Sequence, residues 1–269
     1  MATPHTTAQQ LEWVGAEYML RWLGRCGDST VTAFGEARAV LTPDHANADF
    51  LNTVHRLLPD DDDQVPRIAA HYREAGVRPW FELMPAPGFD RLAGALAGVG
   101  GRHIGFLTMS ERELPAPPPA PLPGGVAVYS VAAGSPDVDT FARVLPVGHD
   151  VPDEHREGAI VRTRENAGVE GARLYLATVD GVPAAAAVLL VAGNVGYLAN
   201  ASTLPGYRRR GCQGALIQRR LADAAAAGCE RASILTVWDS QSHANAVRAG
   251  FRPAYTKAVW RVGEPDAAS

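Results

Sequence analysis

The segment TLPGYRRRGCQGALIQRRL, residues 203–221, predicts a phosphate-binding turn. An apolar run that suits a strand leads into it, a turn rich in Arg and Gly lies in its middle, and an Ala-rich helical pattern follows. The first turn of a helix has N–H groups without intrahelical partners and carries the positive end of the helix dipole. The glycines allow the backbone to approach an anion closely, and the arginines add charge-assisted donors. The residues expected to surround a phosphate or pyrophosphate are Arg208, Arg209, Arg210, Gly211 and Gly214.

The chain around this turn predicts an α/β domain with a mixed sheet. The pair Asp180-Gly181 separates two apolar runs and is a strong hairpin signal, because both residues tolerate the positive φ of a tight turn. An isolated RRRG sequence is more often a solvated helix start, so the surrounding elements are needed to support the phosphate site. We expect strands at residues 126–131, 172–179, 182–191, 197–203, 232–237 and 253–262, and helices at 137–145, 155–167, 211–227 and 242–248.

The N-terminal half repeats part of this order. Its last five predicted elements match the order at the end of the chain, which indicates two related folds and a possible duplication. The stretch ELPAPPPAPLPGG between the halves favours an extended polyproline II linker. We therefore expect an N-terminal domain at 1–112, a linker at 113–125 and a C-terminal domain at 126–269. The elements expected before the linker are helices at 9–25, 65–75 and 89–97 and strands near 30–40, 49–57, 78–83 and 103–109.

Composition sets limits on the kinds of partner. A length of 269 residues suits two domains, and 46% hydrophobic residues are enough to build cores. A net charge of -4 gives no global field for nonspecific nucleic-acid binding, so any phosphate site must be local. Three widely spaced cysteines support neither a disulfide framework nor a zinc site. We find no secretion signal or apolar run long enough to span a membrane, and we expect a cytoplasmic protein without a metal.

The residues of the turn resemble motif A of the GNAT superfamily of N-acetyltransferases, Q/R-x-x-G-x-G/A. Arg208 stands in the first position and Gly211 in the fourth, whereas Gln213 departs from the second glycine or alanine, with Gly214 beside it. Leu204-Pro205 before the turn, a short helix opened by Ser242 and Asn245, and the sequence Ala249-Gly250-Phe251 also match, so the resemblance covers about residues 124–262. It implies tandem GNAT-like α/β folds, each a mixed central sheet flanked by helices, with a degenerate N-terminal copy.

The resemblance also implies acetyl-CoA or another acyl-CoA as co-substrate. In this family the strand before motif A pairs with the pantetheine arm, and one of its N–H groups polarises the thioester carbonyl. Transfer would follow by direct attack of a small molecule's primary amine, with neither nucleic acid nor membrane as partner. The residues implied to bind the cofactor are Ala201, Ser202, Thr203, Arg208, Arg209, Arg210, Gly211, Cys212, Gln213, Gly214, Ser242 and Asn245.

Proton transfer is the open part of this expectation. The family's usual tyrosine acid would fall at Ala246, and the strand at 197–203 carries no carboxylate. His149, His155 and Glu154, in the segment expected to cover the substrate groove, are the candidate bases, although each also suits a solvated loop. A catalytically silent acyl-CoA-binding sensor is the alternative function. Acylation of a protein N-terminus or lysine is a third.

The N-terminal copy of the turn differs in charge. Where the C-terminal copy has arginines and glycines, the earlier one reads LPDDDDQV, residues 58–65. Four aspartates would repel a pyrophosphate, but they suit a helix N-terminus. We therefore expect one CoA site per chain.

Overall fold

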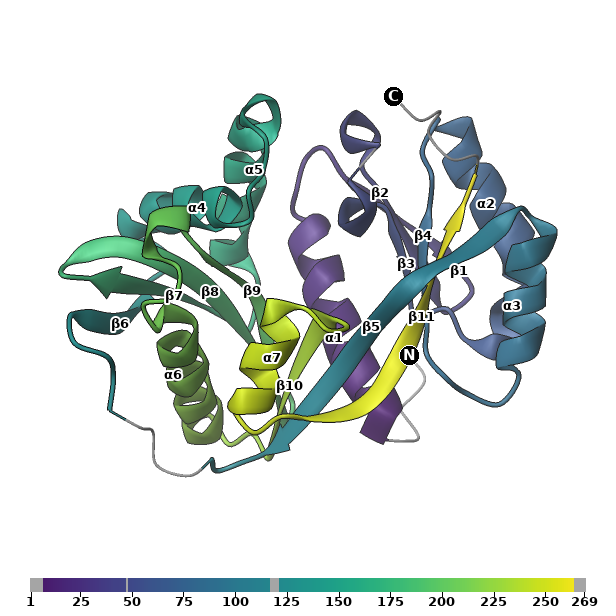
Figure 1. Cartoon of the computed structure of the whole chain (residues 1–269). Coiled ribbons are helices and arrows are strands. Elements are labelled where there is room, and N and C mark those ends of the chain that lie inside the picture. Colours follow the sequence, from purple (N-terminus) through teal and green to yellow (C-terminus); the bar gives the residue numbers. More distant parts are fainter. Residues whose placement is uncertain (1–6, 47, 117–120, 264–269) are drawn as a thin grey trace. The chain divides into compact units, whose positions relative to one another are not determined.

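A computed structural model describes the chain except for residues 1–6, 47, 117–120 and 264–269 (Figure 1). Contacts divide it into two compact units. The first contains the described residues up to Met109 and those from Ala254 onward, and the second contains Ser110–Pro253. The last strand thus lies mainly in the first unit, where it pairs antiparallel with the strand containing Phe81 and Glu82. The expected C-terminal domain, 126–269, therefore extends too far at its end.

The second unit has helices on both faces of a mixed sheet (Figure 1). Its strand order is β10-β9-β8-β7-β6, and the end of β5 lies beside β10. β9 and β10 are parallel, whereas β6 to β9 pair antiparallel. Its elements are β6 (Val126–Val131), α4 (Asp137–Gly148), α5 (Asp153–Arg164), η4 (Glu165–Gly168), β7 (Ala172–Val179), β8 (Val182–Ala192), β9 (Val195–Thr203), η5 (Pro205–Tyr207), α6 (Cys212–Ala226), β10 (Arg231–Val237) and α7 (Gln241–Arg248).

The core of this unit forms between α6 and the sheet. Buried side chains of the helix, including Leu216 and Leu221, pack with small residues of β8 such as Ala185 and Ala187. Because these alanines have little volume, the helix can lie close to the strands. The hairpin at Asp180-Gly181 forms as predicted, with φ values of 52° and 82°. α4 covers the other face of the sheet (Figure 1).

The first unit is also α/β. Its strand order is β1-β2-β3-β4-β11-β5, with β3 parallel to β4. The core gathers around Ile68, Tyr72, Phe81 and Leu96, which are buried. Its elements are α1 (Thr7–Leu23), β1 (Thr30–Phe34), β2 (Ala37–Leu41), η1 (Pro43–His45), η2 (Asp49–Leu51), β3 (Thr53–His55), η3 (Pro59–Gln64), α2 (Val65–Glu74), β4 (Trp80–Leu83), α3 (Phe89–Gly98), β5 (Gly101–Glu113) and β11 (Arg252–Val262).

Three sequence expectations need correction. The strand expected at 30–40 is two strands, because Gly35 adopts a positive φ of 61° and turns the chain. The strand expected at 49–57 is a 3-10 helix followed by a strand of three residues. The linker does not begin at Glu113, because β5 continues through that residue before the first proline. The middle of the predicted linker, 117–120, lies outside the described residues.

Candidate active site

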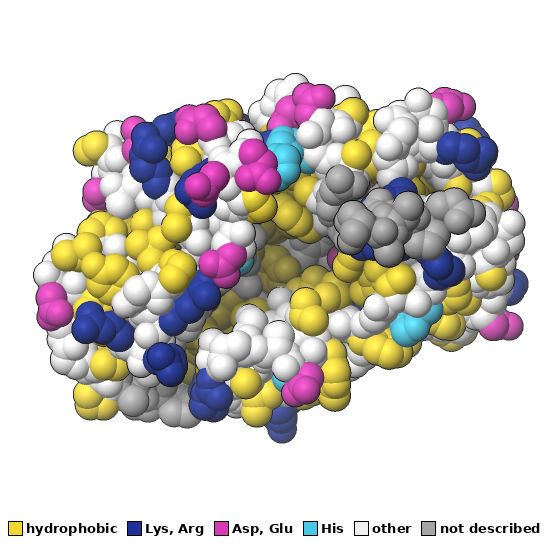
Figure 2. Space-filling view, turned by 45° about the horizontal axis from the view of Figure 1, so that its top comes forward, with side chains coloured by type: hydrophobic (Ala, Val, Ile, Leu, Met, Phe, Trp, Pro, Cys, Tyr) yellow, Lys and Arg dark blue, Asp and Glu magenta, His cyan; other side chains and the backbone are white. Residues whose placement is uncertain are grey.

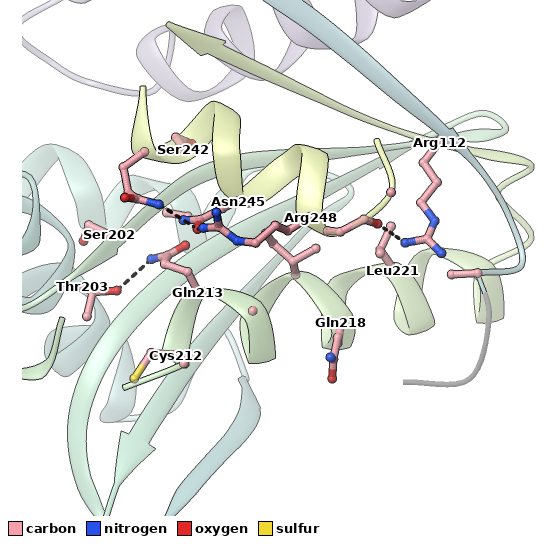
Figure 3. A pocket seen from close by; sticks show the side chains of 18 of the residues that line it. Arg112, Ser202, Thr203, Cys212, Gln213, Gln218, Leu221, Ser242, Asn245 and Arg248 are labelled. Atoms are coloured by element: carbon pink, nitrogen blue, oxygen red, sulfur yellow. Dashed lines mark hydrogen bonds between the residues drawn. The ribbon is translucent and has the colours of Figure 1, made fainter. Parts of the chain in front are cut away.

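A cavity of about 1100 Å³ opens where β9 and β10 separate. The two parallel strands pair only from Val195 to Tyr197 on β9 and from Arg231 to Ser233 on β10. Beyond these residues, the edge of β9 that faces β10 has no strand partner in the described pairing. Ala201, Ser202 and Thr203 at the end of β9 line the cavity together with α6 and α7 (Figure 3). Its volume lies just above the usual range for small-molecule sites.

A β-bulge lies on β9 beside this cavity. Ala199 pairs with Val188 of β8, but Ala201 pairs with Ala187, so Asn200 is the extra residue. Its φ of 33° is unusual for a residue other than glycine. Bulges re-aim the backbone groups next to them and are common beside active sites. The sequence pattern had not indicated this bulge.

The turn after β9 leads directly into α6. Arg209 and Gly211 both have positive φ, 64° and 85°, and α6 begins at the next residue, Cys212. A Cβ at Gly211 would lie 2.5 Å from Pro123 Cγ, so the end of the proline-rich segment packs on this turn. Figure 2 shows basic side chains gathered on this unit, at the left, and Arg208, Arg209 and Arg210 are all exposed.

The cavity brings together most of the predicted cofactor residues. Arg210 does not line it, and its guanidinium lies over the Tyr207 ring, 5.9 Å from the centroid. Those that line it are Ala201, Ser202, Thr203, Arg208, Arg209, Gly211, Cys212, Gln213, Gly214, Ser242 and Asn245.

The side chain of Arg208 is directed toward the end of α4. It donates to the carbonyl oxygens of Thr203 and Gly148, at 3.3 and 3.2 Å, and pairs with Asp150 at 2.7 Å. A Cβ at Gly148 would lie 2.3 Å from Ser202 Oγ, so this glycine permits the close approach of α4 to β9. Arg208 therefore joins the basic turn to α4 through its Nε and Nη2.

Gln213 joins the start of α6 to the end of β9. Its Nε2 donates to Thr203 Oγ1 at 2.9 Å (Figure 3). A glycine or alanine at this position could not make that bond. The departure from the family motif thus adds a link between the strand and the helix.

The third wall of the cavity is α7. Ser240 caps this helix by accepting from the His243 N–H at 3.1 Å. The Asn245 side chain accepts from Gln241 at 3.3 Å and from Arg248 (Figure 3). These contacts fix the polar face of α7 that borders the cavity.

Arg112, at the end of β5, also lines the cavity and was missed by sequence reasoning. It donates to the carbonyl of Ala249, directly after α7 (Figure 3). A Cβ at Gly250 would lie 3.2 Å from its guanidinium, so the residues that follow α7 pack against this side chain. Arg112 and Ala249 are 137 residues apart, and no local sequence pattern predicts such a contact.

The three candidate bases are not among the residues that line the cavity. His149 follows Gly148, which does line it, whereas Glu154 and His155 are exposed in the first turn of α5. Surrounding protein lowers the pKa of His149 by desolvation, and the Asp150 carboxylate opposes that shift. His149 is itself exposed, and its lowered pKa keeps the imidazole neutral at neutral pH. Of the three, His149 lies nearest along the chain to the cavity wall.

Four further positions bear on the chemistry. Burial raises the pKa of the Cys212 thiol, so it stays protonated and is a poor nucleophile. Ala246 is fully buried in the core of the unit. Tyr207 lines the cavity, whereas the Tyr255 hydroxyl donates to Glu12 at 2.7 Å in the first unit.

Comparison with known proteins identifies this architecture. Residues 148–243 match a family model described as an acetyltransferase (GNAT) domain. This part of the chain is a GNAT domain. The match includes β9, the basic turn and α6, which line the cavity, but it ends within α7, the third wall. No curated protein matches the sequence significantly.

Solved structures extend the likeness to the whole chain. A GCN5-related N-acetyltransferase from Kribbella flavida is 18% identical, with a TM-score of 0.70 over 98% of each chain. One from Sphaerobacter thermophilus is 16% identical, with a TM-score of 0.63 over 84% of this chain and 80% of that one. A tandem GNAT protein from the clavulanic acid biosynthesis pathway is 14% identical, with a TM-score of 0.65 over 96% and 94%. The fold is therefore that of tandem GNAT proteins.

The N-terminal counterpart of the basic turn is built differently. Residues 59–64 form η3, and Asp61 accepts from the Leu58 N–H at 3.0 Å. Asp60 pairs with Arg91 at 2.8 Å. The aspartates thus lie at the start of a helical segment, as the sequence predicted.

None of the helices in the described part of the chain is long and apolar enough to cross a bilayer.

Proposed function

We propose that the GNAT domain binds acetyl-CoA, or another acyl-CoA, and transfers the acyl group to the primary amine of a small molecule. The observation that carries the proposal is the cavity, which runs from the unpaired edge of β9 to the first turn of α6. The strand edge offers backbone groups to the pantetheine amides. The free N–H groups of the helix suit the pyrophosphate. Because acyl-CoA is an intracellular metabolite, we place the reaction in the cytoplasm.

The reaction is a direct transfer between two bound substrates. The amine nitrogen attacks the thioester carbonyl, a C–N bond forms, and the C–S bond breaks with its electron pair leaving on the CoA sulfur. An N–H of the bulged strand near Ala201 stabilises the developing oxyanion. Holding the amine against the thioester supplies a further part of the rate. Cys212, buried and protonated, forms no acyl intermediate.

His149 is our proposed acceptor of the amine proton. It adjoins Gly148 at the cavity wall, and its lowered pKa favours the neutral imidazole that a base requires. A proton transfer from the nitrogen, directly or through water, would leave a neutral amide product. Glu154 and His155 are the less favoured candidates, because they lie further along the chain from Gly148 at the cavity wall.

A titration and a turnover assay test this function. Acetyl-CoA binding is measured by calorimetry, and thiol release is followed with a panel of polyamines, aminoglycosides and amino acids. We expect binding with a Kd in the micromolar range, and release that depends on one class of amine. Absence of acetyl-CoA binding at millimolar concentration contradicts the proposal.

One observation favours a second function. Ala246 is fully buried where relatives would place a tyrosine acid, and β9 carries no carboxylate. A domain of this kind could bind acyl-CoA as a sensor without turning it over. Tight acetyl-CoA binding with no thiol release on any amine, lysine peptides included, selects this alternative.

A further inference from the structure

Arg220 of α6 is a fully buried cation in the core of the GNAT domain. Its Nε donates to the Leu216 carbonyl one turn earlier, at 3.1 Å. Its Nη1 donates to two strand carbonyls, Val188 on β8 at 3.0 Å and Ala199 on β9 at 3.2 Å. The guanidinium therefore joins the helix to both strands.

These two carbonyls mark the position of the β-bulge. Val188 and Ala199 are register partners, and the pairing shifts by one residue directly after them, so that Asn200 is left over. A bulge disrupts the local ladder and leaves backbone groups without their usual partners. Arg220 supplies a donor at the point where the regular ladder stops.

Stability alone does not explain this arrangement. Among the described residues no carboxylate forms an ion pair with Arg220, and its Nη2 is buried without a hydrogen-bond partner. Desolvation lowers its pKa to about 9, which still leaves it charged at neutral pH. A buried, partly unsatisfied charge is costly to maintain in a protein core.

We propose that Arg220 is a positioning residue that holds the bulge of β9, and with it the N–H that receives the thioester oxyanion. This inference rests on the proposed acyl transfer. Arg220 acts through the backbone and does not contact the substrates. Its loss should affect the transition state more than acyl-CoA binding, because the pyrophosphate is held elsewhere, at the start of α6.

The first test compares Arg220→Met with Arg219→Met. Arg219 is the adjacent residue of α6, half-buried and paired with Asp223 at 3.0 Å, so it controls for loss of one arginine. For Arg220→Met we expect kcat to fall about 10- to 100-fold, with the KM for acetyl-CoA changed less than about threefold. Arg219→Met should keep both values. A folded Arg220→Met variant with wild-type kcat overturns the proposal.

A rescue experiment separates positioning from a general packing role. Guanidinium chloride below its denaturing concentration should restore part of the kcat of Arg220→Ala, and sodium chloride should not. Arg220→Lys should retain more activity than Arg220→Met, because an ammonium can still donate to one carbonyl. If Arg220→Met does not fold, Arg220→Lys takes its place in the kinetic comparison with Arg219→Met. Parallel loss of kcat and acetyl-CoA affinity without rescue contradicts the proposal.

Failure of the proposed function would be recognised separately. If the wild-type protein has no transferase activity, the amide resonances of Asn200 and Ala201 still report on the bulge. We expect Arg220→Met to shift them and Arg219→Met to leave them in place. Unchanged resonances in both variants exclude the positioning role, whatever reaction the domain carries out.

Discussion

At the scale of single residues, Gly211 is the position of the basic turn before α6 that least tolerates a side chain. Its φ of 85° is unfavourable for alanine, and a Cβ would lie 2.5 Å from Pro123 Cγ. Gly211→Ala should weaken acetyl-CoA binding by about tenfold or more, since strain of 1 to 2 kcal/mol is enough for that change. Calorimetry measures it, with Gly206→Ala as control, because a Cβ there meets nothing within 4 Å. Equal affinities would show that the turn adapts.

His149 should determine how the reaction depends on pH. Its pKa lies below the ordinary value, so the imidazole loses its proton at lower pH than a free histidine would. If it is the base, kcat/KM should rise with pH through a midpoint below about 6.5 and then level off. His149→Gln should lower kcat/KM by about 100-fold or more and abolish its rise with pH. His155→Gln should preserve both the value of kcat/KM and its rise with pH. A rise of kcat/KM with pH that persists in His149→Gln would show that another residue is the base.

At the scale of elements, α7 cannot simply accept the family's usual tyrosine. Ala246 is fully buried, whereas its neighbour Val247 is 50% exposed. Ala246→Tyr should therefore lower the free energy of unfolding by about 1 to 3 kcal/mol through overpacking, without a gain in kcat. Val247→Tyr, one position along the same helix, should leave stability nearly unchanged. Denaturant unfolding compares the two, and a stable, faster Ala246→Tyr would show that the core has room for an acid.

Elements with a local signal were predictable and those fixed by distant contacts were not. The Asp180-Gly181 hairpin and the glycine turn before α6 follow from backbone preferences of a few residues. The bulge at Asn200 depends on pairing with β8 and on a guanidinium 20 residues later in the chain, at Arg220. Arg112 reaches α7 across 137 residues. A single sequence contains no periodicity that reports such contacts.

At the scale of the whole molecule, β5 and β11 do not respect the domain boundary that the proline-rich stretch predicted. β5 continues past Met109 into the second unit, and most of β11 returns to the first, where it pairs with β4. Lys257 of β11 is buried there between Glu12 and Glu82, at 2.7 and 2.6 Å. The chain was expected to divide at the linker because prolines end regular structure. No sequence pattern predicts that β11 pairs with a strand of the first unit. A cut at the linker would therefore separate β11 from β4, its partner in the sheet.

The difference between the two units also predicts how many acyl-CoA molecules the chain binds. The second unit has a glycine turn with positive φ, an open strand edge and exposed arginines, whereas the corresponding turn of the first has four aspartates in η3. Calorimetry of the full chain should therefore give one acetyl-CoA per chain, because the aspartates repel a pyrophosphate and offer no glycine turn. Gly211→Ala should weaken that single binding event, and replacement of residues 60–63 by Asn should not change its affinity or stoichiometry. A stoichiometry of two, with one site unaffected by Gly211→Ala, would show that the first unit retains a working acyl-CoA site.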